Sequence, residues 1–265
     1  YSPNGGGYFD CIDNEVFSQQ LSFLNHHFGI VSVEQFFEVS SSKDGLQVAI
    51  TFDDGYLDNY THALPALVEN NIKACYFFVT TDYISANNLL WHDAARISYI
   101  HGKSDKVEVE GKLLAISRGE WFERSYFDEL ASDISDIEVP SMMMSWEQVS
   151  DLIKHGFEVG AHTCNHTPLS FLSAEQKHEQ LSCSIKLVNS KLGQTSTHFA
   201  YPNGSFDDFS MEVLAKNDIK FAYTIKSGCN EKSTPKLQLK RIGINTYETK
   251  QVVLLKLLMA VLRNR

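Results

Sequence analysis

The chain has 265 residues, of which 43% are hydrophobic, and its formal net charge is −10. That length and apolar content suffice for one full hydrophobic core, so we expect a single domain over residues 1–265. The negative charge argues against nucleic-acid binding, which needs a basic surface, and it favours neutral or cationic partners. Five cysteines without CxxC spacing indicate free, mostly buried thiols rather than a disulfide framework.

Segments of strand and helix character alternate along the chain, which predicts a parallel α/β architecture. Capping-box patterns begin two of the predicted helices, at Ser145 and at Ser173. The strands are predicted at 46–52, 74–79, 157–161, 198–201, 221–225 and 239–244. The helices are predicted at 13–27, 58–70, 145–155, 173–192 and from Asp207 onward.

Two segments lie outside this alternation. Residues 82–141 carry aromatic side chains among charged ones, so we expect a folded insertion after the second strand. Residues 252–262 are apolar apart from Lys256, and no apolar run of the chain is long enough to span a membrane. We interpret 252–262 as an ordinary packed helix, with a peripheral membrane-surface contact helped by Arg263 and Arg265 as the alternative.

Two adjacent carboxylates, Asp53 and Asp54, follow a short apolar strand and precede Gly55. A strand that ends in this way places both side chains at the rim of a sheet, where ligands are usually bound. Successive strand residues point in opposite directions, so one carboxylate can hold a metal while the other handles a proton. The alternative is an Asp-Gly turn that only closes a strand.

A second polar pattern places His162 and His166 four residues apart, directly after the strand predicted at 157–161. On a helical turn these imidazoles lie on one face, in the geometry that binds zinc. Two imidazoles and one carboxylate form a three-ligand site with a position left for water. A lone HxxxH pair often arises by chance, but its occurrence downstream of a strand-end Asp-Asp-Gly favours a metal site.

These motifs resemble those of the polysaccharide deacetylases, carbohydrate esterase family 4. Residues 51–55 (TFDDG) are similar to the first motif of that family, and residues 162–166 (HTCNH) to the second. A degenerate third motif follows at 199–204 (FAYPNG), and the resemblance extends from about Leu46 to about Ile244. It implies a distorted, incomplete (β/α) barrel of the polysaccharide deacetylase type, with the site at the C-terminal ends of the strands.

The resemblance also implies a role for each matching residue. Asp54, His162 and His166 would bind a divalent metal ion, with zinc favoured and cobalt or nickel as alternatives. Asp53 would be the general base that deprotonates the attacking water. The backbone N–H of Asn203 would stabilise the oxyanion that forms.

Two functional positions of the family are altered in this chain. The third-motif arginine that orients the catalytic aspartate is Ala200 here, and we expect Arg241 to take its place, with an ordinary surface cation as the alternative. The last motif of the family supplies the general acid from a histidine, but no histidine follows His198. His92 in the insertion is one candidate for this acid and His198 is another, although each also suits a surface or capping role.

We therefore expect a metal-dependent hydrolase that removes N-acetyl groups from an N-acetylated sugar or polysaccharide. Trp91 is expected to stack on a sugar ring, and Tyr201 and Pro202 are the other predicted substrate contacts. An O-acetyl or formyl hydrolase acting on a small sugar and an inactive glycan-binding homologue are the alternatives. The chain shows no signal peptide, which a removed leader would also explain, so its location stays open, with the bacterial cell envelope or periplasm favoured.

Overall fold

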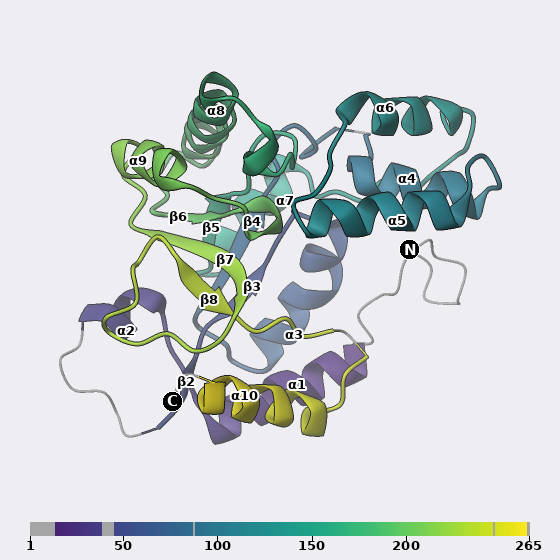
Figure 1. The fold of residues 1–265 in the computed structure, drawn as a ribbon. Coiled ribbons are helices and arrows are strands. Elements are labelled where there is room, and N and C mark those ends of the chain that lie inside the picture. Colours follow the sequence, from purple (N-terminus) through teal and green to yellow (C-terminus); the bar gives the residue numbers. More distant parts are fainter. Residues whose placement is uncertain (1–13, 39–44, 87, 246, 264–265) are drawn as a thin grey trace.

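A six-stranded parallel sheet forms the centre of the computed structural model, which describes residues 14–38, 45–86, 88–245 and 247–263 (Figure 1). The strands pair in the order β3-β4-β5-β6-β7-β8. Because each strand lies beside the next one in the sequence, the sheet winds in one direction and curls into the half-barrel that the sequence predicts. The strands are β3 (Ile50–Phe52), β4 (Cys75–Val79), β5 (Glu158–Ala161), β6 (His198–Ala200), β7 (Phe221–Ser227) and β8 (Leu239–Arg241).

A small second sheet pairs β1 (Gly29–Ile30) with β2 (Gln47–Val48) in parallel. The single strand predicted at 46–52 is therefore wrong, because β2 pairs with β1 whereas β3 pairs with β4. The predicted last strand is also too long, since β8 ends at Arg241. The other four predicted strands agree with the structure to within two residues at each end.

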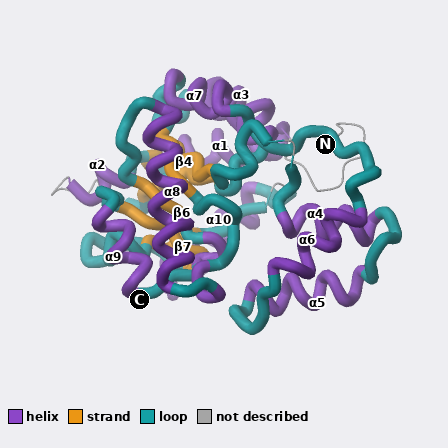
Figure 2. The backbone as a smooth tube through the Cα atoms, turned by 90° about the horizontal axis from the view of Figure 1, so that it is seen from above, coloured by secondary structure: helices purple, strands orange, loops and turns teal. Residues whose placement is uncertain are grey.

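Helices surround the sheet (Figures 1 and 2). The capping boxes predicted at Ser145 and Ser173 are both present, and Gly193 ends the second of these helices in a left-handed conformation. The helices are α1 (Asn14–His27), α2 (Val33–Glu38), α3 (Leu64–Glu69), α7 (Trp146–Lys154), α8 (Ala174–Leu192), α9 (Asp208–Lys216) and α10 (Lys250–Arg263), with short 3-10 turns η2 (Leu169–Phe171) and η3 (Pro202–Gly204).

The helix predicted at 58–70 consists of two parts, a π-helical segment η1 (Asn59–Ala63) and α3. Pro65 explains the division. Its ring nitrogen cannot donate to the preceding turn, so Pro65 is tolerated only in the first turn of a helix, where a free N–H has no partner in any case. The structure places Pro65 in the first turn of α3.

The main hydrophobic core lies between one face of the sheet and the surrounding helices. Phe77, Val159 and Phe199 from the strands pack there with Leu67 and Leu181 from the helices, and all five are at most 1% exposed. A smaller cluster on the other face contains Tyr76, Phe78, Ala200, Tyr223 and Leu239. Both clusters follow from the alternation of side chains along each strand. Within the described residues, Cys75, Cys164, Cys183 and Cys229 form no disulfide, and Cys11 lies outside this part of the chain.

The predicted insertion folds into three helices, α4 (Trp91–Ile100), α5 (Lys106–Ser117) and α6 (Arg124–Asp133). Figure 2 shows them as a separate group beside the strands. They have a hydrophobic cluster of their own, in which Trp91, Val109 and Phe127 are buried. The insertion is therefore a packed subdomain, as the aromatic residues in its sequence predict.

Gly160 in β5 generates a prediction about the packing of the sheet. A Cβ atom there would lie 2.4 Å from the His198 carbonyl oxygen and 2.8 Å from the Phe78 ring. Gly160→Ala should therefore lower the free energy of unfolding by about 1–3 kcal/mol, the usual cost of overpacking a core. Gly111→Ala is the control, because Gly111 lies in α5 with no atom within 4 Å of the added methyl, and it should stabilise by about 0.5–1 kcal/mol. Equal urea midpoints for the two variants would contradict this packing.

Candidate metal and catalytic site

The chain reverses direction immediately after β3, and this reversal separates the two neighbouring carboxylates. Asp54 and Gly55 have positive φ angles of 74° and 90°, and the Gly55 N–H donates to the Asp53 carbonyl oxygen at 2.9 Å. A side chain at Gly55 would collide with Ile84, whose Cδ1 lies 2.7 Å from the added Cβ. The strained backbone turns the Asp53 and Asp54 carboxylates toward different partners.

The Asp54 carboxylate faces the two histidines of the second motif. Its Oδ1 atom lies 3.3 Å from Nε2 of His162 and 3.1 Å from Nε2 of His166. One candidate ligand atom from each residue lies within 4.8 Å of the others. Bonds of about 2.0–2.2 Å to one tetrahedral ion would place such atoms roughly 3.3–3.6 Å apart, so the cluster has the dimensions of a three-ligand metal site.

One hydrogen bond to the backbone fixes the tautomer of His162 that a metal ligand needs. Its Nδ1 atom lies 2.7 Å from the carbonyl oxygen of Ala200, to which only a protonated Nδ1 can donate. That tautomer leaves the Nε2 lone pair directed at Asp54, the usual arrangement of a metal-binding histidine. Asp54 Oδ1 and His166 Nδ1 are buried without a hydrogen-bond partner among the described residues. A buried carboxylate oxygen of this kind is expected to bind something, and a metal ion fits the donor set.

The expectation that His162 and His166 lie on one helical turn is wrong. β5 ends at Ala161, and Thr163 and His166 both have positive φ angles, 64° and 60°, so the segment is an irregular loop. The Thr163 hydroxyl accepts a hydrogen bond from the His166 N–H at 3.1 Å and holds the loop. Cys164 contacts the carbonyl of Gln180 on α8 and so points away from the cluster.

Arg241 lies where the sequence predicts it, against the Asp53 carboxylate. Its Nη1 and Nη2 atoms donate to the two carboxylate oxygens, each at 2.7 Å, which is the bidentate geometry of a strong ion pair. Nη1 also lies 3.2 Å from the Thr51 hydroxyl, and Nε donates to the Thr224 carbonyl at 2.8 Å. Burial raises the pKa of Asp53, but the charge and hydrogen bonds of the Arg241 guanidinium outweigh it and hold the pKa below its ordinary value.

The insertion brings His92 to the same place. Its ring centroid lies 5.0 Å from that of His166, well inside the distance of about 10 Å beyond which direct or one-water proton transfer fails. Tyr56, a residue that the sequence did not single out, has its hydroxyl 3.1 Å from His92 Nε2 and donates to Asp93 Oδ2 at 2.7 Å. Burial and the neighbouring His166 lower the pKa of His92 to about 3, and burial raises that of Asp93 to about 7.

Trp91 binds the backbone of the second motif at His166. It is only 4% exposed, its indole N–H donates to the His166 carbonyl at 3.2 Å, and its ring packs on Phe122 and Phe127. The expected stacking of Trp91 on a sugar is corrected by this burial, which leaves no free ring face. Trp91 is also the first residue of α4, and Leu90 is the N-cap residue of this helix.

The third motif lies under the site. Tyr201 is fully buried, donates to the Leu237 carbonyl at 3.1 Å and stacks on Phe206, and Pro202 is also buried. These two side chains therefore offer no surface to a sugar in this conformation, contrary to the predicted contacts. Asn203 is half-buried in a left-handed conformation with φ at 53°, and the oxyanion role of its N–H stays a prediction.

His198 is not at the site. It is 1% exposed, and its two ring nitrogens contact the Glu34 carboxylate and, at 2.9 Å, the Tyr223 hydroxyl. Its ring stacks on Phe221. Both nitrogens are thus bound in a buried network on the opposite side of β6 from the main core. His198 is therefore not available as the general acid, contrary to that candidate role.

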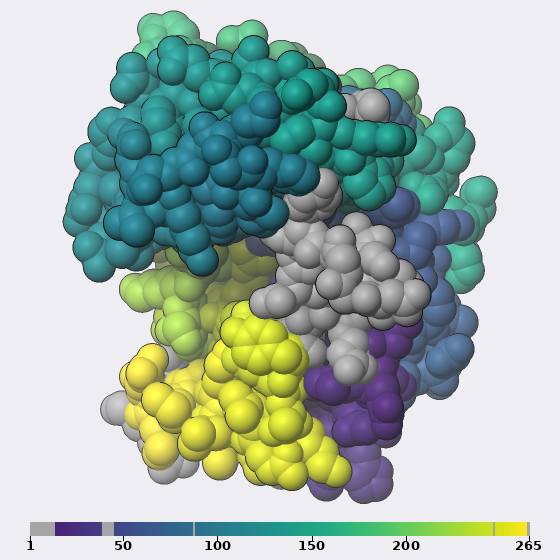
Figure 3. Space-filling model, turned by 90° about the vertical axis from the view of Figure 1, so that its right-hand side faces the viewer, coloured from purple at the N-terminus to yellow at the C-terminus, as the bar shows by residue number. Residues whose placement is uncertain are grey.

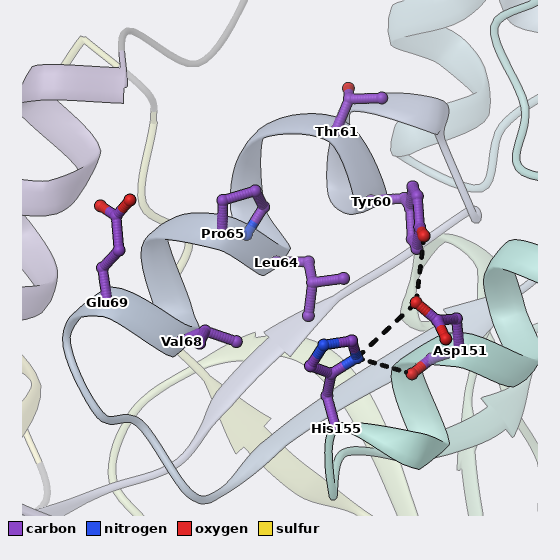
Figure 4. A pocket seen from close by; sticks show the side chains of 8 residues that line it. All are labelled: Tyr60, Thr61, Leu64, Pro65, Val68, Glu69, Asp151 and His155. Carbon is purple, nitrogen blue, oxygen red and sulfur yellow. Dashed lines mark hydrogen bonds and ion pairs between the residues drawn. The ribbon is translucent and has the colours of Figure 1, made fainter.

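A surface hollow of about 550 Å³ lies elsewhere, between α3 and α7 (Figure 4). Figure 4 shows Leu64 and Val68 lining it, with Asp151 engaged by Tyr60 and His155. The Tyr60 hydroxyl donates to Asp151 at 3.0 Å. Tyr60 and His155 therefore both bind Asp151, and none of the metal-site residues lines the hollow.

Known proteins resemble this chain in sequence and in fold. The family model described as polysaccharide deacetylase matches residues 41–222. YxkH of Bacillus subtilis, provisionally named a polysaccharide deacetylase, is 21% identical over 198 residues, which cover 75% of this chain and 51% of YxkH. The peptidoglycan deacetylase of Helicobacter pylori is 28% identical over 79 residues, or 30% of this chain and 27% of that protein. The chain thus matches about half the length of YxkH and about a quarter of the length of the Helicobacter pylori protein.

Solved structures share the fold over most of the chain. The Streptococcus pyogenes deacetylase PplD gives a TM-score of 0.65 at 18% identity, covering 97% of this chain and 92% of PplD. IcaB from Ammonifex degensii gives 0.63 at 21% identity, covering 92% and 88%. At such identities the likeness establishes the half-barrel fold.

The Arg241–Asp53 pair generates a prediction about stability and pH. Arg241→Gln should lower the free energy of unfolding at pH 7 by on the order of 2 kcal/mol, less than the ~3–5 kcal/mol of a fully buried pair because the Asp53 side chain is 28% exposed. With the arginine, the pKa of Asp53 is depressed, so the pair stabilises above the unfolded pKa and the benefit is lost as pH falls.

Without the arginine, burial raises that pKa, so the destabilisation should shrink as the pH falls and Asp53 is protonated. Urea unfolding from pH 7 down to pH 4 measures the difference. Lys216→Gln is the control, because its pair with Glu212 is exposed and should contribute almost nothing. A difference for Arg241→Gln that does not change with pH would show that the lost interaction is not with Asp53.

Proposed function

The chain belongs to the polysaccharide deacetylase family, and from this premise we propose that it is a metal-dependent hydrolase that removes N-acetyl groups from an N-acetylated sugar or polysaccharide. One observation carries the proposal. Asp54 joins His162 and His166 in a cluster with metal-site dimensions, while Asp53, the next residue, is held apart from that cluster by Arg241. Two adjacent carboxylates are thereby available for two different tasks.

Asp53 is the base in this proposal. Arg241 keeps its carboxylate ionised and fixed in orientation, so that it can take a proton from a water molecule that attacks the acetyl carbon. The backbone N–H of Asn203 donates to the oxyanion of the tetrahedral intermediate. Breakage of the carbon–nitrogen bond then releases acetate and an amine, which requires a proton on the leaving nitrogen.

His92 is proposed to deliver that proton. It lies beside His166 and is oriented by Tyr56, which also binds Asp93. Because burial lowers the pKa of His92 to about 3, the ring is neutral at rest near pH 7. The proton that it delivers must therefore come during turnover from the attacking water that Asp53 deprotonates.

Asp54, His162 and His166 are proposed to hold the metal, with zinc favoured and cobalt or nickel compatible with the same two-nitrogen, one-oxygen donor set. A divalent ion there would acidify a water molecule and polarise the acetyl carbonyl. The inactive glycan-binding alternative is disfavoured, because such a protein gains nothing from a complete ligand set and an oriented base.

None of the helices in the described part of the chain has the length and apolar content of a membrane-spanning segment.

The division of labour between the adjacent carboxylates is tested by two variants. His166→Ala should lose the stoichiometric zinc found by elemental analysis, since one of three ligands is removed. Asp53→Asn should keep the zinc yet release acetate from an N-acetylated chitooligosaccharide at least about 10²-fold more slowly. Loss of zinc in Asp53→Asn would make Asp53 a ligand instead, and full zinc occupancy in His166→Ala would refute the metal site.

The role of His92 is tested separately. His92→Gln should keep its zinc and slow acetate release by roughly 10²–10⁴-fold, the range expected when a proton donor is removed. His178→Gln, an exposed histidine on α8, is the matched control and should have wild-type rates. Tyr56→Phe should cause a smaller loss, because the ring stays in place without its orienting hydroxyl. Wild-type turnover in His92→Gln would assign the proton to another group.

A further inference from the structure

The C-terminal helix α10 exposes an apolar face to solvent. Val253, Leu257 and Ala260 face inward and are at most 7% exposed. The opposite side should be polar in an ordinary surface helix. Instead it is formed by six apolar side chains that are 36–66% exposed, namely Val252, Leu254, Leu255, Leu258, Met259 and Leu262. Figure 3 shows the helix, in yellow, as an outer ridge of the molecule.

Helical geometry makes these six side chains one continuous face. Residues are spaced 100° apart around a helix, so positions 254, 258 and 262 form one row and positions 252, 255 and 259 lie beside it. Gln251 is the only polar residue among them. Tyr247, which is 67% exposed, and Ile244, which is 38% exposed, add two apolar side chains in the segment just before the helix. We call these eight side chains the α10 face.

The charged residues of helix α10 itself are of one sign. Helix α10 contains Lys250, Lys256 and Arg263 and no acidic residue, although the chain as a whole carries −10. Lys256 is used internally, because it binds Glu248 at 2.5 Å and the Gly243 carbonyl. Lys250 and Arg263 stay exposed at the two ends of the helix. Salt screens charges beyond about 8 Å, so a partner at this face meets these local cations before the distant acids.

We propose that the α10 face docks on the surface of a bilayer that contains anionic lipids. An apolar helical face bordered by cations is the pattern of helices that lie in the membrane–water interface, and an exposed tyrosine at one end suits the headgroup region. The 14 residues of α10 extend about 21 Å, which is short of the ~30 Å hydrocarbon core, so the helix lies flat.

A second copy of the chain fits the α10 face less well. Two-fold pairing of the same face would bring the cations of two α10 helices together, with no acidic residue of α10 to balance them. Anionic headgroups complement the same cations. The charge pattern therefore selects a lipid surface over self-association.

Docking in this way would place the candidate site near the membrane surface. Ile244, at one end of the α10 face, follows Arg241 by three residues, so at most about 11 Å of extended chain separates them. Arg241 is the residue that binds Asp53. The inference concerns binding alone and stands whether or not the protein is a deacetylase.

Vesicle flotation tests the proposal with the whole chain. The protein should float with vesicles of phosphatidylcholine mixed with phosphatidylglycerol, less with phosphatidylcholine alone, and less again at high salt. Leu255→Gln/Leu258→Gln/Leu262→Gln should lower the partition coefficient at least about tenfold. Arg263→Gln should weaken binding only to the anionic vesicles.

Val107→Gln/Leu114→Gln is the control, because these side chains on α5 are 80% and 50% exposed but lie outside the α10 face. It should float like the wild type. A wild type that stays unbound with both vesicles, or a control that loses as much binding as the triple variant, would overturn the proposal. So would a wild-type dimer in light scattering that the triple variant converts to a monomer, since a second copy would then cover the α10 face.

Discussion

The ion pair between Arg241 and Asp53 connects the two edges of the open sheet. β3 and β8 are not hydrogen-bonded neighbours in the described sheet, yet the guanidinium reaches from the end of β8 to Thr51 in β3 and to Asp53 directly after it. Two contacts with Asp53 and one with Thr51 therefore link the two edges of the half-barrel and position the candidate base. Arg241 thus binds Asp53 from β8, whereas the third-motif position at which an arginine was expected is Ala200.

The second constraint is the backbone reversal at Asp54, which depends on long-range packing. Only a glycine fits at position 55, because Ile84 and Val79 fill the space that a Cβ atom would need. The His166 loop in turn is held by Trp91, which belongs to the insertion and packs on Phe127. The insertion is therefore part of the site's support, and Tyr56 links the Asp54 turn to it through Asp93.

The sequence predicts the parts of this architecture that depend on local patterns. Strand ends that deliver Asp53, Asp54 and His162 follow from apolar runs that stop at polar residues, and capping boxes mark α7 and α8. The loop at His166 could not be predicted in this way, because its positive φ angles leave no signature in the residue types.

Long-range packing accounts for the other differences. The sequence shows that Trp91 is aromatic but not that aromatic neighbours in the insertion bury it. Nor does it show that the two ring nitrogens of His198 are already bound by Glu34 and Tyr223. Tyr56 follows the first motif directly, and its role depends on contacts with an insertion more than thirty residues away, namely with His92 and Asp93.

The central claim is that Asp53 and Asp54, although adjacent, have different tasks: Asp54 binds the metal and Asp53 acts as the base. Anomalous diffraction at the zinc edge from a crystal of the zinc-loaded protein tests it most directly. The account predicts one strong peak about 2.0–2.2 Å from an Asp54 carboxylate oxygen and from Nε2 of His162 and His166, with Asp53 still paired with Arg241. A peak ligated by Asp53, or one that lies away from the two histidines, would contradict it.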